Sequence, residues 1–267
     1  MKAILIDLDG VLYVGDAIVP GAVKTIDWLR DQGIGHRFLT NTTSRPRGAL
    51  VEKLARIGIR VTEEEIITPP VVARAWLQSH GVSRVALFVP EATRPEFTGL
   101  EVLPSDAETA AGAVVLGDLG AAWDFDTLNR AFRLLMTEPR PRLLALGMTR
   151  YWRAPDGLRL DTGPYVAALR EATGIEPVVV GKPDRVFFET ALADLGTTPA
   201  QALMIGDDIR GDIDGAQRAG IRGILVRTGK YRPEDLRGTI QPHAVIDSIA
   251  DLPAWWQQQA RSIASPP

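Results

Sequence analysis

Two aspartates lie two residues apart near the start of the chain, in the segment Asp7-Leu8-Asp9-Gly10. The apolar run at 3–6 before them predicts a buried strand. Side chains two residues apart in an extended chain point to the same side, so Asp7 and Asp9 face one way. Two close carboxylates repel each other unless a cation or a shared proton relieves the repulsion. The segment therefore indicates either a cation-binding pair or an acidic turn at a polar strand end.

A second acidic cluster, Asp207, Asp208 and Asp212, follows another apolar run at 203–205. Capping of a helix predicted over 211–219 accounts for one of these acids, because carboxylates suit a helix N-terminus. Capping accounts poorly for all three. Two acidic clusters at neighbouring strand ends form an oxygen-rich site of the kind that Mg²⁺ prefers.

Three further residues follow predicted strands: Thr40, Asn41 and Lys182. Taken alone, Thr40 and Asn41 are ordinary turn residues, and Lys182 is a surface lysine. Open parallel sheets, however, bind ligands beyond the carboxyl ends of their strands, where all four segments are predicted to lie. An aspartate can attack phosphorus, a cation and a lysine can neutralise phosphoryl oxygens, and a second aspartate can move protons. The combination favours phosphoryl chemistry.

The elements that must position these residues are short apolar strands alternating with amphipathic helices, which predicts an α/β fold with a largely parallel sheet. Before residue 68, strands are predicted at 3–6, 36–39 and 59–61, and helices at 21–32 and 46–57. A second series has strands at 85–89, 113–116 and 143–146, a helix at 125–136, a hairpin at 151–160 and a helix that starts at Pro164. A third series has strands at 178–180, 202–205 and 223–226, and helices at 184–195 and 211–219.

The motif order divides the chain into a catalytic core and an inserted domain. We expect the core at 1–75 and 176–267, and an α/β cap domain at 76–175. A length of 267 residues suits two domains.

At the level of these motifs, the sequence resembles the haloacid dehalogenase (HAD) superfamily of phosphohydrolases, in its large-cap subfamily IIA. The motifs are Asp7–Tyr13, Thr40-Asn41, Lys182 and Gly206-Asp207-Asp208 with Asp212. The similarity is closest to the branch that includes phospholysine phosphohistidine inorganic pyrophosphate phosphatase. The segments that carry it are Thr40–Thr43, Leu128–Leu135, Asp156–Leu160, Val180–Pro183 and Gly223–Tyr231.

The resemblance implies a Rossmann-like core, an aspartyl-phosphate intermediate and a bound Mg²⁺. It implies Asp7 as the nucleophile and Asp9 as the general acid and base. The metal would be held by the Asp7 carboxylate, the Asp9 main-chain carbonyl and Asp207. Thr40, Asn41 and Lys182 would then hold the phosphoryl group, and Asp208 and Asp212 would be supporting acids.

The cap of such enzymes covers the site and selects the leaving group. Tyr151, Trp152 and Arg153, beside the predicted Pro-Asp-Gly turn, are the candidates for substrate contact, because aromatic faces and a cation can grip a planar or anionic group. The alternative is that Trp152 only packs the hairpin. We expect a small phosphorylated metabolite as the substrate.

Composition excludes several other classes of protein. The chain has 30 Lys and Arg against 33 Asp and Glu, a net charge of −3, which argues against a nucleic-acid surface. With no cysteine there is no disulfide, thiolate site or cysteine nucleophile. No apolar run approaches the roughly 18 residues of a membrane span, and no signal peptide is legible, so we expect a cytoplasmic protein. The oligomeric state stays open, with a homodimer common among relatives.

Other functions remain as alternatives at this point. A receiver-type phosphoacceptor module shares the acids, Thr and Lys, but it is about half as long and has no cap. A catalytically inactive binding or regulatory protein on the HAD scaffold would not need every motif filled. A dehalogenase would not need the acids at 207 and 208. Cleavage of inorganic pyrophosphate or of a phosphoramidate is the remaining alternative.

Overall fold

The computed structural model describes residues 2–154 and 156–264, and it divides into two compact units. The first unit comprises Met1–Thr40, Val51–Ile67 and Phe188–Pro267, and the second comprises Asn41–Leu50 and Thr68–Phe187. The predicted cap, 76–175, falls inside the second unit, while the predicted domain limits stay a prediction. No helix in the described ranges is long and apolar enough to cross a bilayer.

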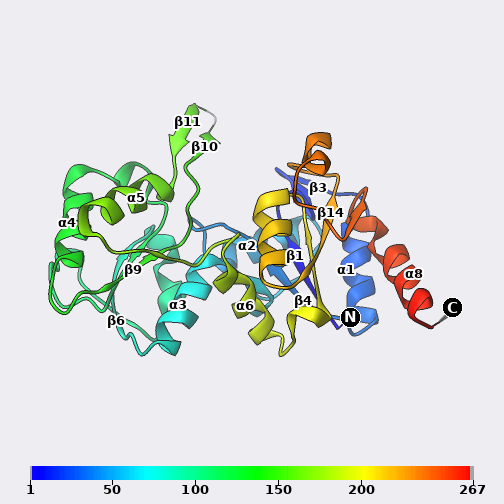
Figure 1. Ribbon diagram of the computed structural model, residues 1–267, viewed down its shortest axis with the longest axis horizontal. Helices are drawn as coiled ribbons and strands as arrows, with labels where there is room; N and C mark the ends of the chain where they lie inside the picture. The colour runs from blue at the N-terminus through cyan, green and yellow to red at the C-terminus, as the bar shows by residue number, and fades with distance from the viewer. Residues whose placement is uncertain (1, 155, 265–267) are drawn as a thin grey trace. The chain divides into compact units, whose positions relative to one another are not determined.

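The first unit is built on a six-stranded sheet in which every pairing is parallel (Figure 1). From one edge to the other its strands are β15 (Ala244–Ile246), β14 (Arg222–Val226), β13 (Ala202–Gly206), β1 (Ala3–Asp7), β4 (Gly35–Leu39) and β5 (Ile66–Ile67). All five residues of β1 and of β13 are buried, as expected for central parallel strands covered on both faces. The α/β class and the parallel sheet are thus confirmed.

Several helices have residues in the first unit. They are α1 (Ala22–Asp31), α2 (Arg47–Arg56), α6 (Arg185–Asp194), α7 (Gly215–Arg218) and α8 (Leu252–Ala264). Helix α1 buries Ala22, Ile26 and Leu29, and the chain leaves it through Gly33 at a φ of 63°. A short hairpin, β2 (Tyr13–Val14) and β3 (Ala17–Ile18), follows β1.

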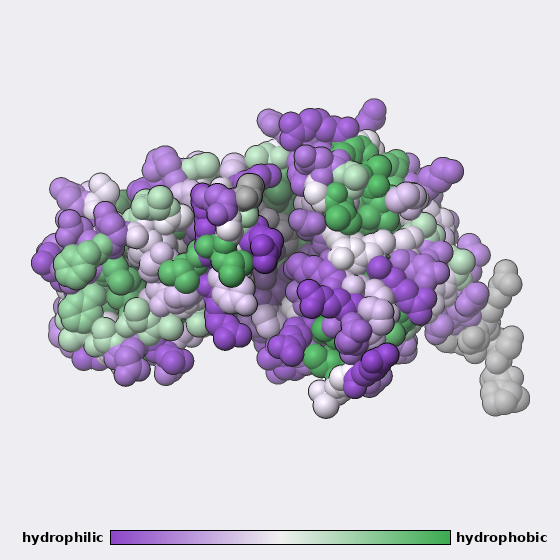
Figure 2. Space-filling model, turned by 90° about the horizontal axis from the view of Figure 1, so that it is seen from above, coloured by the Kyte–Doolittle hydropathy of each residue, from purple (hydrophilic) through white to green (hydrophobic). Residues whose placement is uncertain are grey.

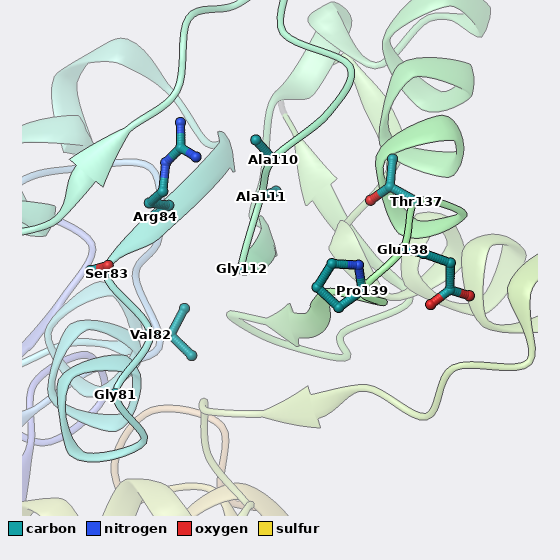
Figure 3. Close-up of a pocket in the computed structure, with 10 residues that line it drawn as sticks. All are labelled: Gly81, Val82, Ser83, Arg84, Ala110, Ala111, Gly112, Thr137, Glu138 and Pro139. Atoms are coloured by element: carbon teal, nitrogen blue, oxygen red, sulfur yellow. The ribbon is translucent and has the colours of Figure 1, made fainter.

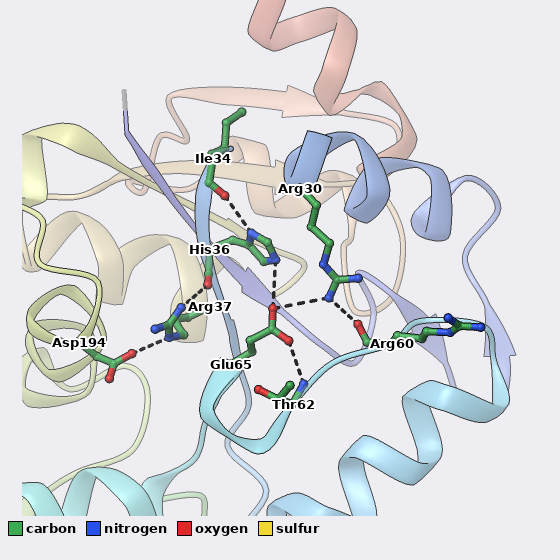
Figure 4. A network of polar contacts seen from close by, with 8 residues as sticks. All are labelled: Arg30, Ile34, His36, Arg37, Arg60, Thr62, Glu65 and Asp194. Carbon is green, nitrogen blue, oxygen red and sulfur yellow. Dashed lines mark hydrogen bonds and ion pairs between the residues drawn. The ribbon is translucent and has the colours of Figure 1, made fainter. Parts of the chain in front are cut away.

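A polar network holds β4 beside β5 in the first unit (Figure 4). The Glu65 carboxylate accepts a hydrogen bond of 2.8 Å from the Thr62 amide, and it lies 3.5 Å from Arg30 and 3.6 Å from His36 Nε2. The other ring nitrogen of His36 is 2.9 Å from the Ile34 carbonyl. His36 therefore helps to fix strand β4 against the segment that precedes β5.

The second unit has its own five-stranded parallel sheet. Its strands, in spatial order, are β12 (Val178–Val179), β9 (Arg142–Ala145), β8 (Ala113–Leu116), β6 (Arg84–Phe88) and β7 (Glu101–Val102). Its helices are α3 (Pro69–Ser79), α4 (Phe125–Leu135) and α5 (Thr162–Thr173). An antiparallel hairpin, β10 (Tyr151–Ala154) and β11 (Gly157–Leu160), projects from it, as predicted, while Pro155 of the expected turn lies outside the described residues.

Four sequence-based expectations about elements were wrong in detail. The strand expected at 59–61 lies instead at Ile66–Ile67, because a capped 3₁₀ turn at Glu63–Glu65 comes first. Helix α5 begins at Thr162, capped by Asp161, and not at Pro164. The helix expected over 211–219 is a π-helical turn, Ile209–Asp214, followed by α7. The strand near 178 pairs with β9, so it extends the second sheet and not the core sheet.

Candidate active site

Three buried carboxylates from two distant parts of the sequence come together in the first unit. Asp7, Asp207 and Asp212 each place one carboxylate oxygen within 4.8 Å of the others. Their side chains are almost fully buried, at 7%, 1% and 1% exposure. Carboxylates gathered at this density are a donor set that suits a hard cation such as Mg²⁺.

The sheet topology explains why these residues meet. Asp7 ends β1 and Asp207 directly follows β13, and these two strands are parallel neighbours with Ile6 opposite Ile205. The chain proceeds from β1 to β4 on one side and later fills β13 and β14 on the other. The space between the carboxyl ends of β1 and β13 is therefore the point at which the strand order reverses, where open α/β sheets bind ligands.

Glycines make the room that Asp207 occupies. Gly10 has a φ of 90°, and a Cβ atom placed there would overlap the Asp207 carboxylate. Gly229 has a φ of 65°, and a Cβ atom placed there would also overlap the Asp207 carboxylate. A side chain at either position would displace the carboxylate, so both glycines are requirements of the acidic cluster.

Asp208 and Asp212 have different surroundings although they belong to one motif. Asp208 is partly exposed and caps the π-helical turn, accepting hydrogen bonds of 3.0 and 2.9 Å from the amides of Arg210 and Gly211. Asp212 lies within the cluster and accepts a 3.2 Å hydrogen bond from the Asp208 amide. Helix capping thus accounts for Asp208 alone, as the sequence argument anticipated for one acid of the three.

Asp9 is exposed, unlike Asp7, and its residue bridges to Tyr13 in the turn after β1. The two aspartates predicted to act together therefore differ in access to solvent. Thr40 follows β4, the neighbour of β1 on its other side, and is buried at 6% exposure. Its amide donates to the Ile67 carbonyl at 3.1 Å.

A lysine that the sequence argument did not assign lies against the acids. The Lys230 amide donates to Asp207 at 2.7 Å, and its ammonium lies 3.3 Å from Asp208. Desolvation opposes its charge, but the carboxylates of Asp208, Asp207, Asp7 and Asp212 outweigh this and raise the pKa of Lys230. Burial acts to raise the pKa of Asp208. The hydrogen bond from the Gly211 amide and the positive charge of Lys230 outweigh this effect, so the pKa of Asp208 lies below its usual value.

The segment after β14 that carries Lys230 is tied to the turn after β1. The Thr228 hydroxyl donates a hydrogen bond to the Gly10 carbonyl. The sequence contained a signal for the role of Lys230, because Thr228-Gly229-Lys230 is a polar run that follows a predicted strand, as the other four motifs do.

Asn41 and Lys182 form a reciprocal pair within the second unit. The Asn41 amide donates to the Lys182 carbonyl at 2.8 Å, and the Asn41 carbonyl oxygen accepts from the Lys182 amide at 2.8 Å. Lys182 is buried at 8% exposure. The segment after Asn41 is fixed where α2 begins, because Arg47 donates two hydrogen bonds of 2.8 Å to the buried Glu96. Two predicted site residues thus hold each other.

Known sequences place the chain in a family. A profile described as haloacid dehalogenase-like hydrolase matches residues 4–102, and one described as HAD-hydrolase-like matches 179–252. The haloacid dehalogenase-like hydrolase domain-containing protein 2 of Homo sapiens is 43% identical over 235 residues, covering 88% of this chain and 87% of that protein. The chain belongs to the HAD superfamily.

Two further likenesses locate it within the superfamily. The phospholysine phosphohistidine inorganic pyrophosphate phosphatase of Homo sapiens is 37% identical over 256 residues, covering 94% of this HAD chain and 92% of that protein. The solved p-nitrophenyl phosphatase from Archaeoglobus fulgidus superposes with a TM-score of 0.83 at 29% identity, over 94% of this chain and 97% of that one. The chain is a HAD-type hydrolase of the phosphatase group, and the predicted resemblance is confirmed.

The HAD chain presents the candidate specificity residues on an exposed hairpin. Tyr151 is 58% exposed and Trp152 is 41% exposed, and Leu158 and Leu160 on the facing strand are also open to solvent. Figure 2 looks down on the side of the second unit that carries this hairpin, where hydrophobic and strongly hydrophilic side chains lie next to one another. Trp152 is therefore not fully used in packing the hairpin, although its substrate role stays a prediction.

Proposed function

We propose that this HAD chain is a Mg²⁺-dependent phosphatase that hydrolyses a small phosphorylated metabolite through an aspartyl-phosphate on Asp7. The observation that carries the proposal is the group of three buried carboxylates, Asp7, Asp207 and Asp212, within 4.8 Å of one another. An enzyme that only bound a neutral ligand would not need to hold three like charges out of water.

The acidic cluster fits Mg²⁺, because its three side chains are carboxylates, and Gly10 and Gly229 leave the room that the Asp207 carboxylate needs to join them. Asp7, Asp207 and the Asp9 main-chain carbonyl would hold the ion, with Asp208 and Asp212 in support. When bound, Mg²⁺ supplies charge neutralisation for the phosphoryl oxygens.

The chain's own residues would then perform two successive displacements. An Asp7 carboxylate oxygen attacks phosphorus, the phosphorus–oxygen bond of the ester breaks, and Asp9 donates a proton to the leaving oxygen. Asp9 next takes a proton from a water molecule, whose oxygen attacks the aspartyl-phosphate and releases inorganic phosphate and free Asp7. The exposure of Asp9 supports this role, because a general acid must reach an incoming leaving group.

Thr40, Asn41 and Lys182 would bind the phosphoryl group. The two hydrogen bonds between Asn41 and Lys182 use the main chain of Lys182, so they orient that residue without consuming its ammonium group. A lysine held in this way neutralises developing negative charge at little cost in reorganisation. Tyr151, Trp152 and Arg153 would contact the leaving group.

The test uses purified protein and 4-nitrophenyl phosphate. Phosphate release should require Mg²⁺ and stop in EDTA, and Asp7→Asn should be nearly inactive because its amide is a poor nucleophile. Asp16→Asn, a change of the same type at an exposed residue after the β2 strand, is the matched control and should keep full activity. Equal turnover by the wild type and Asp7→Asn would refute the proposal.

A further inference from the structure

The second unit has a pocket at the place where its own sheet reverses direction. Strand β6 pairs with β7 on one side and with β8 on the other, and the chain visits β7 before it returns to β8. A cavity of about 350 Å³ opens beyond the carboxyl ends of these three strands. Its lining comprises Leu87, Phe88, Val89, Arg94, Ser105, Leu119, Ala122, Asp126, Thr127 and Arg130. This is the position at which α/β sheets bind ligands.

Arg130, on α4, is held rigidly in this wall. Its guanidinium carbon lies 4.8 Å from the centre of the Phe88 ring, its Nε donates to the Ala107 carbonyl at 2.9 Å, and its Nη2 donates to the Pro104 carbonyl at 3.1 Å. These contacts use one edge of the guanidinium. The remaining N–H donors of a guanidinium fixed in this manner suit bidentate recognition of a carboxylate or phosphate.

Arg94 brings a second positive charge to the same pocket. Its ion pair is with Glu91 at 3.5 Å, and that carboxylate is 89% exposed, so the pair contributes little. Burial lowers the pKa of Arg130, and the charge of Arg94 lowers it further. The negative charges of Asp106 and Glu108 raise this pKa and offset part of the decrease. Two like charges that face one cavity are relieved when an anion binds between them.

Acids near the pocket offset part of this positive charge, but the two arginines outnumber the one acid in the lining, Asp126, an exposed residue at the start of α4. Asp106 acts on Arg130 as a compensating charge, and Glu108 is engaged by Arg133 in an ion pair of 2.7 Å. The deeper wall is apolar, because Leu87, Phe88 and Val89 are buried strand residues at 6%, 2% and 3% exposure. The hydroxyl residues Ser105 and Thr127 lie among the lining groups.

We propose that this pocket of the second unit is a binding site for a small organic anion, with its carboxylate or phosphate head held by Arg94 and Arg130 and a compact apolar group against Leu87, Phe88 and Val89. The site shares no residue with the acidic cluster. Its arginines would bind an anion, whereas the carboxylates of the cluster would bind a cation. It is a second ligand site on the chain, and it does not depend on the proposed phosphatase chemistry.

A second cavity in the same unit lacks the pair of arginines that the proposed site has. It has about 380 Å³ and is lined by residues before β6, β8 and β9, among them Gly81, Ala110, Gly112 and Pro139 (Figure 3). It therefore lies at the amino ends of the strands. Its arginine, Arg84, is engaged with Glu101 at 3.0 Å, so this cavity offers no converging pair of cations from its lining.

The experiment follows the methyl NMR signals of the full chain, in EDTA, while benzoate or phenylphosphonate is added. Benzoate presents a carboxylate head and phenylphosphonate a phosphate-like head that hydrolysis cannot remove. We expect at least one probe to shift the methyl signals of Leu87, Val89 and Leu119 in a saturable way. Shifts confined to methyl groups of the first unit, or no saturable shift with either probe, would overturn the proposal.

Two variants and one control assign the effect to the arginines. Arg94→Gln and Arg130→Gln should each weaken the binding by about tenfold or more, the loss expected when a charged hydrogen-bonding group is removed. Arg84→Gln changes an arginine of the same unit that lines the other cavity and not this one, and it should leave binding unchanged. Arg94→Gln remains informative if Arg130→Gln fails to fold, because the ion pair that Arg94 makes within the described part of the chain is with the exposed Glu91. Unchanged affinity in Arg94→Gln would contradict the assignment.

Discussion

Replacing Asp212 by Asn should stabilise the metal-free protein and weaken its response to Mg²⁺. The three carboxylates of Asp7, Asp207 and Asp212 lie within 4.8 Å of one another. At that distance two unit charges repel by about 3.5 kcal/mol for an effective dielectric constant of about 20. Asp212→Asn removes two of the three repulsive pairs while it keeps the shape of the side chain and its acceptor for the Asp208 amide.

The expected change in melting temperature follows from the size of the chain. Lys230 and the hydrogen bonds already offset part of the repulsion, so we expect a net gain of about 1–2 kcal/mol in EDTA. Unfolding entropy of about 2.1 cal/mol/K per residue gives about 0.56 kcal/mol/K for 267 residues, so the melting temperature should rise by about 2–4 °C. For the wild type, Mg²⁺ at about 100 times its Kd should add about 2.7 kcal/mol, or about 5 °C. In Asp212→Asn this Mg²⁺-dependent rise should be smaller.

Differential scanning calorimetry in EDTA and in Mg²⁺ measures both effects. Asp214→Asn is the matched control, because it removes a carboxylate of the same turn that takes part in a partly exposed ion pair of 3.1 Å with Arg218. This control should change the melting temperature by about 1 °C or less and keep the full Mg²⁺ response. A lower melting temperature of Asp212→Asn in EDTA, together with an undiminished Mg²⁺ response, would refute the electrostatic account of the cluster.

Two further predictions concern single carboxylates. Asp9→Asn should slow hydrolysis of alkyl phosphates more than that of 4-nitrophenyl phosphate, because a good leaving group needs no proton; equal losses in kcat/KM on the two substrates would argue against Asp9 as the general acid. Burial raises the pKa of Asp161 in the folded protein, so the folded state holds that proton more tightly than the unfolded one, and stability should fall as the pH rises from the unfolded value of 3.8 through the raised value. Asp161→Asn, which retains a helix-capping side chain, should flatten this part of the stability profile in thermal melts between about pH 3 and 6, and an unchanged slope would contradict the assignment.

Local patterns in the sequence predicted most of the elements and the chemistry-bearing residues. Apolar runs of four to five residues marked β1, β8 and β13 because the burial of a central parallel strand leaves almost no polar position. The carboxylates follow two of those strands directly, so their place at strand ends could be read from the order of residues alone. Two of the elements that were wrong lie where a local capping motif competes, at Glu63–Glu65 and at Asp161.

Tertiary structure decided which strand ends meet. No local pattern states that β13 pairs with β1 or that β12 pairs with β9, because pairing depends on contacts between segments far apart in the chain. The pairing of β1 with β13 brings Asp207 and Asp212 to Asp7, and the neighbouring β14 brings Lys230 to them. The sequence by itself thus determined the kinds of groups available and their positions at the ends of elements. Only the folded chain decided that three carboxylates share one buried space, because their burial and mutual distance are properties of the assembled sheet.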